Sequence, residues 1–302
     1  MIVSRGINIV AVFSLFCMLA AGCATTEKIT DDIIGKGETL KKKVAFLPTV
    51  NNSGFGGEDF QKAAMAQLKA CLDQRCDALR VVHSEKIREA LEDIPHLDSG
   101  QIDHLALAAL GRSYGLNAAV EETIIEIECV TEKCGIWGFK RPCMLARSFF
   151  RVRAYDIETT AVIFDGIVRD ALEISEYERQ SIEKGAGYDK DMAARILAKA
   201  TPKIAKLICE GFAEEPWKGF ITSSSDNTFT IAAGEDVGLA RGDVLEVFGM
   251  GEPIKGQGDQ VYLVSGPKLG EIKVTNVQRD LAEAVGLFGH DLKNSCCVKM
   301  KP

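Results

Sequence analysis

The 302-residue sequence predicts an α+β fold: an α/β N-terminal module with a mixed sheet, followed by a small all-β barrel or sandwich domain. Three observations support this prediction. From residue 44 to 215, short apolar runs alternate with segments of helical apolar periodicity. In the middle of that region the period changes to two, which is typical of strands with one solvated face. After residue 219 only short strand-like segments recur, separated by Gly, Asp and Asn.

The module begins with residues 44–48 (VAFLP), a short apolar run typical of a buried strand. The glycine-rich segment 51–57 indicates a turn-rich loop. The next segment predicts a helix, because one apolar residue recurs at every fourth position and forms a single stripe. The members of that stripe are Phe60, Ala64, Leu68 and Leu72.

A second strand is predicted over residues 79–82, and Ser84 is placed to cap the helix that follows, since its hydroxyl can accept from first-turn amides. Another helix is predicted over residues 100–114 and is stopped by Gly115. Its buried side should carry Ile102, Leu105 and Ala109.

The period-two region predicts a run of antiparallel strands. Ile125 and Ile127 alternate with glutamates, and Val152 and Ala154 alternate with polar residues. Residues 156–160 favour a hairpin turn into a strand over 161–172, and the loop between the first two strands holds Cys129, Cys134, Trp137, Phe139 and Cys143. A long helix over 189–213 completes the module, and Pro202 should kink or divide it. Its apolar stripe consists of Met192, Ile196, Ala200, Ile204 and Ile208.

Residues 214–217 mark the boundary between a domain over 44–215 and an all-β domain over 219–300. The segment 238–244 (GLARGDV) indicates a tight turn in which glycine supplies positive φ. The expected strands of this domain are 219–222, 228–232, 244–248, 260–264, 270–277 and 281–285.

The N-terminus has the pattern of a lipoprotein signal peptide over residues 1–22. Arg5 precedes an apolar run over 7–21 that is too short to span a bilayer comfortably. Small residues lead directly to Cys23, which we expect to be the lipidated residue. The polar residues 23–43 should form a tether, with Lys41 to Lys43 in solvent. The segment resembles the lipobox of bacterial lipoproteins, in which an Asp after the lipidated Cys signals inner-membrane retention. The resemblance therefore implies, from Ala24, an outer-membrane location facing the periplasm.

Eight further cysteines suggest disulfides in an oxidising compartment, because their number is even. Two pairs, Cys71 with Cys76 and Cys129 with Cys134, are each five residues apart, close enough for local bridges if the intervening chain turns. The pairing cannot be derived from sequence, and free buried thiols stay open as an alternative. The eight are Cys71, Cys76, Cys129, Cys134, Cys143, Cys209, Cys296 and Cys297.

No pattern in the sequence predicts a catalytic, cofactor-binding or metal-binding residue. The segment 54–57 lacks the Gly-Lys-Ser/Thr ending of a phosphate loop, and Glu58 and Asp59 would repel a phosphate. His96 and His104 fit no metal-ligand spacing. The net charge of −7 offers no basic stripe for nucleic acid.

Trp137 and Phe139 allow two interpretations. The cysteine-rich loop that holds them either packs its aromatic side chains onto its own disulfide or presents them as a partner-binding tip. We favour the first interpretation, but the second stays open because aromatic residues concentrate at protein interfaces.

Several motifs of the second domain, over about residues 219–300, resemble the C-terminal domain of flagellar assembly protein T. They are 238–239 (GL), 241–244 (RGDV), 269–274 (LGEIKV) and 282–285 (AEAV). Residues 294–298 depart from the family's turn, and a disulfide from Cys296 or Cys297 to Cys209 could replace it.

The first domain resembles the α/β module of curli-secretion lipoproteins, penicillin-binding-protein activator lipoproteins and the N-terminal domain of TolB. The matching segments are 44–48 (VAFLP), 52–54 (NSG) and 154–156 (AYD) with its threonine turn. No catalytic residue carries over from these families.

The resemblance implies a non-catalytic, lipid-anchored envelope protein that binds other envelope proteins, needs no cofactor and can form oligomers. It would support assembly of a flagellar or secretory surface machine. The alternatives are an outer-membrane activator of a peptidoglycan synthase and a curli-type secretion channel subunit.

Overall fold

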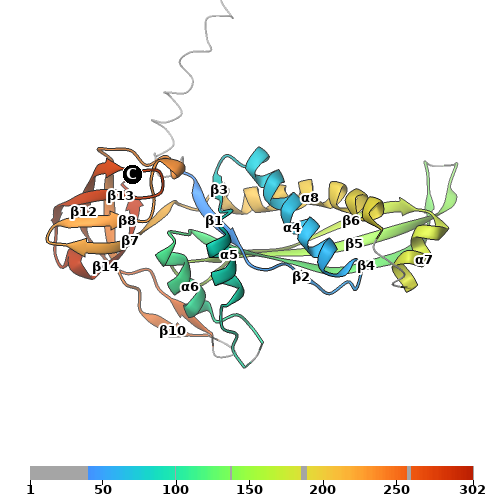
Figure 1. Cartoon of the computed structure of the whole chain (residues 1–302), viewed down its shortest axis with the longest axis horizontal. Helices are drawn as coiled ribbons and strands as arrows, with labels where there is room; N and C mark the ends of the chain where they lie inside the picture. The colour runs from blue at the N-terminus through green and yellow to red at the C-terminus, as the bar shows by residue number, and fades with distance from the viewer. Residues whose placement is uncertain (1–39, 99, 137, 185–188, 257–259, 302) are drawn as a thin grey trace, which may run out of the picture.

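The structure is a computed structural model that describes residues 40–98, 100–136, 138–184, 189–256 and 260–301. A mixed sheet with helices lies along the long axis, and a closed β-barrel lies at one end of it (Figure 1). The predicted fold class, an α+β module followed by a small all-β domain, is confirmed.

The sheet has the strand order β3-β1-β4-β5-β6. β1 (Lys42–Phe46) runs parallel to both β3 (Leu79–Val81) and β4 (Ala118–Cys134). The two-residue β2 (Val50–Asn51) also pairs in parallel with β4. β5 (Arg141–Asp156) and β6 (Val162–Ile174) continue the sheet in antiparallel orientation.

Two cores form because side chains of β1 alternate between the faces of the sheet. Val44 and Phe46 join the core that contains residues of α4 (Gly57–Arg75) and α8 (Lys190–Ala213). Ala45 and Leu47 point to the other face, where the core includes residues of α5 (Glu85–Glu92) and α6 (His104–Ser113). Burial on both faces explains the continuous apolar run in this strand.

The stripes predicted for the two long helices are confirmed. On α4 the buried residues are Phe60, Ala64, Leu68 and Leu72. On α8 the residues of the predicted stripe are also buried, namely Met192, Ile196, Ala200, Ile204 and Ile208. The Asp189 side chain caps the first turn by accepting from two backbone amides. Pro202 lies inside α8 and does not divide it, so of the two predicted effects only a kink stays open.

The predicted buried face of α6 was wrong. Leu105 is exposed and Ala109 lies on the solvent side, while Leu107 and Ala108 are buried. The close approach of Gly111 to Ile157 sets this orientation, since a Cβ at Gly111 would come within 2.5 Å of the Ile157 side chain. Ser84 occupies the N-cap of α5 as predicted, but its side chain makes no capping hydrogen bond.

The alternation predicted around Ile125 is interrupted by a register shift between Ile124 and Glu126. Because a bulge adds one residue to the strand, Ile124 and Ile127 are the buried residues and Ile125 is only half-buried. A further helix, α7 (Glu176–Lys184), follows β6 and was not predicted. Its signal was a capping box in which Ser175 and Glu178 bond to each other's backbone amides.

Six strands close the barrel in the order β12-β13-β8-β7-β14-β9. A separate two-stranded hairpin, β10 with β11, leaves the barrel between β9 and β12. The strands are β7 (Lys218–Ser225), β8 (Thr228–Ile231), β9 (Val244–Gly249), β10 (Pro253–Lys255), β11 (Val261–Leu263), β12 (Lys268–Val277), β13 (Ala282–Gly289) and β14 (Ser295–Met300).

Residues 40–43 belong to the folded part, so the predicted tether over 23–43 extends too far. Leu40 packs in the barrel core, and Lys42 and Lys43 are buried within β1. The expectation that this lysine run lies in solvent holds only for Lys41. Burial of Lys43 is compensated, because its Nζ donates to the Ala232 carbonyl and lies 3.7 Å from the Asp236 carboxylate.

Buried polar groups join the sheet module to the barrel. The Lys218 Nζ of β7 lies 2.7 Å from an Asp156 carboxylate oxygen and 3.0 Å from one of Glu158. The Asn117 side chain donates to the Lys218 carbonyl and accepts from the Lys43 amide. These partners come from both domains, so the hydrogen bonds and ion pairs form only when the barrel is packed against the sheet module. Within the described ranges no helix has the length and apolarity needed to cross a membrane.

Candidate functional site

The hairpin of β4 and β5 is buried or half-buried along most of its length and exposed at its end. Its strands pair continuously from Ala118 with Asp156 to Cys134 with Arg141. At about 3.3 Å per residue, the 17 residues of β4 extend over about 55 Å. The hairpin end lies on the long axis opposite the barrel, beside α7 (Figure 1). The predicted loop over 129–143 is therefore mostly strand, because β4 continues to Cys134 and β5 begins at Arg141.

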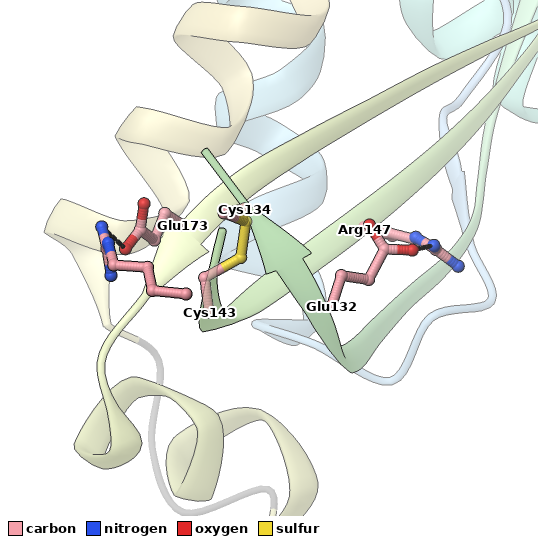
Figure 2. The surroundings of a disulfide bond; sticks show 6 residues. Glu132, Cys134, Cys143, Arg147 and Glu173 are labelled. Carbon is pink, nitrogen blue, oxygen red and sulfur yellow. Dashed lines mark hydrogen bonds and ion pairs between the residues drawn. A yellow bond between two sulfur atoms is a disulfide. The ribbon is translucent and has the colours of Figure 1, made fainter. Parts of the chain in front are cut away.

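Figure 2 shows how this end of the hairpin is braced. A disulfide joins Cys134 to Cys143 across the two strands. Glu132 and Arg147 form an ion pair on one side, and Arg141 pairs with Glu173 of β6 at 2.7 Å on the other. These cross-links hold both strands of the hairpin end and connect it to β6.

A tight turn closes the hairpin. The Phe139 amide donates to the Ile136 carbonyl, and Gly138 has a φ of 90°. Gly135 also has positive φ, and a Cβ at this position would come within 2.4 Å of the Phe139 carbonyl oxygen. Glycine is therefore required at both positions.

The turn presents apolar side chains to solvent. Ile136 is 78% exposed and Phe139 is 82% exposed, the two largest values among the exposed large hydrophobic residues described. Three basic residues flank them, namely Lys133, Lys140 and Arg141, and all are exposed. At 82% exposure the Phe139 side chain does not pack onto the disulfide, so that interpretation is wrong for this residue, and its role in partner binding stays a prediction. Trp137 lies outside the described residues.

The local disulfides expected from sequence spacing were wrong. The structure joins Cys76 to Cys209, so that the end of α4 is linked to α8 across 133 positions of sequence. Cys134 bonds Cys143 rather than Cys129. The bridge from Cys209 to Cys296 or Cys297 is excluded by the same pairing.

Four described cysteines carry free thiols: Cys71, Cys129, Cys296 and Cys297. The adjacent Cys296 and Cys297 lie on β14, which closes the barrel where the resemblance to flagellar assembly protein T predicted a replaced turn. Cys23 lies outside the described residues.

The predicted absence of a metal site concerned His96 and His104. His104 is buried on α6, between the rings of Tyr155 and Tyr262. His96 is exposed and its backbone bridges to Ile102. Among the residues that the structure describes, no group of three His, Cys, Asp or Glu side chains converges to hold a metal ion.

Sequence reasoning missed a cleft between the sheet module and the β10–β11 hairpin, with a volume of about 560 Å³. Glu121, Arg153 and Tyr155 of the sheet face it, together with His104 of α6 and Gln260 and Tyr262 of the barrel domain. These residues are separated by up to half of the chain, so no spacing in the sequence could have indicated the site.

No protein-family model and no curated protein matches the sequence. Solved structures with a similar chain path include a hypothetical protein from Chlamydia trachomatis (17% identity, 56% of this chain and 99% of that one, TM-score 0.33). A lipoprotein from Neisseria meningitidis matches with 12% identity, 55% and 99% coverage and a TM-score of 0.31. TolB from Acinetobacter baumannii matches with 10% identity, 87% and 60% coverage and a TM-score of 0.28. All three scores lie below 0.5, so the fold is assigned from the strand order above.

Proposed function

We propose that this chain is a non-catalytic, lipid-anchored envelope protein that binds another envelope protein through the end of its β4–β5 hairpin. Binding of this kind would support assembly of a surface machine, flagellar or secretory. The observation that carries the proposal is the exposure of Ile136 and Phe139 on a braced hairpin at the end of the molecule opposite the barrel (Figure 1).

The anchor is supported by the sequence. An apolar run over residues 7–21 leads through small residues to Cys23, and an acylated Cys23 would hold the chain at a membrane surface. Leu40, the first residue that the structure describes, packs in the barrel core, so the tether joins the folded part at the barrel end. Residues 23–39 can span at most about 60 Å. The tether thus joins at the end of the molecule opposite the hairpin end, which is left accessible to a partner (Figure 1).

The composition of the hairpin end favours a particular kind of partner. Burial of apolar surface contributes roughly 25 cal/mol per Å², and aromatic side chains often dominate binding energy at interfaces. The exposed basic residues Lys133, Lys140 and Arg141 favour a partner whose apolar pocket is rimmed by carboxylates. The disulfide beside the turn limits the conformational entropy lost on binding.

Site-specific photocrosslinking in living cells tests this proposal. A benzoylphenylalanine at Phe139 should form a discrete adduct with one exported envelope protein, which mass spectrometry identifies. The matched control carries the same group at Phe288, an exposed phenylalanine on the barrel strand β13. The proposal is wrong if Phe139 gives no protein adduct beyond the Phe288 control, or only adducts with lipid.

The identity of the crosslinked protein separates the alternatives. A flagellar or secretory component would support the assembly role, and a peptidoglycan synthase would support the activator role. Adducts only between copies of this chain would instead support a channel-type oligomer.

A further inference from the structure

The cleft between the sheet module and the β10–β11 hairpin has the features of a small-molecule site. It exists only when both domains are assembled, because β4, β5 and α6 form one wall and Gln260 and Tyr262 form the other. Its volume of about 560 Å³ falls within the range of known ligand pockets. It lies apart from the hairpin end that the proposed function uses.

The wall contributed by the barrel domain is held firmly against the sheet module. The Leu263 amide donates to the Thr159 carbonyl, and the Thr160 hydroxyl donates to the Val261 carbonyl. The Gln260 side-chain amide donates to the Ile102 carbonyl and to the Gln101 side chain. The cleft is thus preformed, which lowers the conformational cost of binding.

Two buried polar atoms in this wall have no hydrogen-bond partner in the protein. They are the Oε1 of Gln260, a residue that is 4% exposed, and the Nδ1 of His104, a residue that is 8% exposed. The Ile102 carbonyl accepts from the other end of the Gln260 amide, which fixes Oε1 as an acceptor. An unsatisfied buried polar group is unfavourable, so a ligand that donates a hydrogen bond to Gln260 would be stabilised there.

Aromatic rings form the second feature of the wall. The His104 ring lies 5.0 Å from the Tyr155 ring and 5.9 Å from the Tyr262 ring, measured between centroids. Gly256 packs close to Tyr262, since a Cβ there would come within 2.3 Å of the ring. His104 and Tyr155 are buried and hold the half-buried Tyr262 in place, so Tyr262 is the ring on which a flat, partly apolar ligand can stack.

The charges in the cleft are already paired. The Arg153 guanidinium lies 3.5 Å from Glu121 and 3.2 Å from Asp165, and it donates to the Tyr155 hydroxyl. Burial, assisted by the charge of Arg153, lowers the pKa of His104, which keeps this ring neutral at pH 7. A phosphate or carboxylate would find no free cation among these groups, so the favoured ligand is uncharged.

We propose that this cleft binds a neutral glycan through a pyranose ring stacked on its aromatic wall, with a ligand hydroxyl that donates to Gln260. A sugar ring combines the two properties that the wall demands, an apolar C–H face and several hydroxyl donors. Apolar residues such as Leu47 and Ile102 complete the lining. The polymer from which the glycan comes is not specified by this chemistry.

The test uses the full chain, extracted in a detergent without a sugar headgroup, on a printed panel of neutral glycans that also carries sialylated and phosphorylated ones. At least one neutral glycan should bind, and titration of that glycan by calorimetry then compares variants. Tyr262→Ala and Gln260→Leu should each weaken binding about tenfold. Tyr262→Phe, which keeps the ring, should bind nearly as well as the original chain.

Tyr177→Ala serves as the matched control, because Tyr177 is an exposed tyrosine on α7. Circular dichroism establishes that each variant is folded. Failure of every neutral glycan to bind, binding of charged glycans only, or unchanged affinity in both Tyr262→Ala and Gln260→Leu would overturn the proposal. None of these results would affect the crosslinking of Phe139, so the two proposals fail separately.

Discussion

At the scale of single residues, Glu122 is the carboxyl group most affected by burial. It lies on β4 with 1% of its surface exposed, and the Thr49 hydroxyl donates to its Oε2. Burial raises the pKa of Glu122 to about 7, and the hydrogen bond from Thr49 only partly opposes this effect. The folded protein therefore holds a proton on Glu122 at pH values where the unfolded chain, with a pKa near 4.5, has lost it.

This shift predicts a pH dependence of stability. A carboxyl whose folded pKa lies above its unfolded pKa reduces stability as the pH rises from about 4.5 to about 7. Glu122→Gln removes this effect, so the variant should exceed the original chain in unfolding free energy by up to about 3 kcal/mol at pH 8. At pH 5 the two should differ much less.

Urea unfolding at pH 5 and pH 8 measures both differences. Glu126→Gln is the matched control, because Glu126 lies exposed on the same strand and should change stability little at either pH. The difference in unfolding free energy between Glu122→Gln and the original chain should be larger at pH 8 than at pH 5. Equal differences at the two pH values would show that the Glu122 carboxyl is not buried as described.

The two disulfides that sequence spacing suggested do not form, because spacing does not reveal the secondary structure between the cysteines. Cys71 lies within α4 and Cys76 caps its end, so five residues of helix turn the two side chains to different sides. Cys129 and Cys134 both lie on β4, where five extended residues separate their Cα atoms by about 17 Å. A disulfide requires Cα atoms within about 7 Å, so neither pair can form.

At the scale of elements, the Cys76–Cys209 disulfide links α4 to α8, the two long helices on one face of the sheet. A cross-link restricts the unfolded chain more strongly when it closes a longer loop. Its sequence separation is 133, compared with 9 for the Cys134–Cys143 disulfide at the hairpin end. The two bridges should therefore differ in their contribution to stability.

Cys76→Ala with Cys209→Ala should lower the unfolding free energy by about 2 kcal/mol more than Cys134→Ala with Cys143→Ala. Denaturant unfolding of the two oxidised double variants measures this difference. An equal loss in both would show that the long bridge does not restrict the unfolded chain as proposed. The hairpin variant should instead affect partner crosslinking, since it loosens the strands that support Ile136 and Phe139.

Elements with a sustained apolar period could be predicted, and those set by local or tertiary contacts could not. The stripes of α4 and α8 follow from spacing alone. The buried face of α6 depends on the approach of Gly111 to Ile157, which spacing does not reveal. α7 has too few apolar residues to show a period. β14 was not among the predicted strands, which ended with the segment 281–285.

At the scale of the whole molecule, the barrel and the sheet module act as one unit. Lys218 of β7 is buried with Asp156 and Glu158 of the sheet module, and Lys299 of β14 also lies 3.1 Å from Glu158. Buried pairs of this kind are strongly unfavourable to break, because one charge is then left uncompensated. The division into two domains was predictable, whereas the junction and its cleft were not, since their residues come from distant parts of the chain.

The central claim is that Cys23 is acylated and that the folded part lies in an oxidising compartment. Intact-mass spectrometry of the full-length gene product, isolated from the membrane fraction of its own bacterium, tests this claim most directly. The cytosolic fraction is measured in the same way. The account predicts a chain in the membrane fraction that begins at Cys23, carries lipid on that residue and contains the Cys76–Cys209 and Cys134–Cys143 disulfides. An unmodified chain that begins at Met1, found in the cytosolic fraction with all thiols reduced, would contradict it.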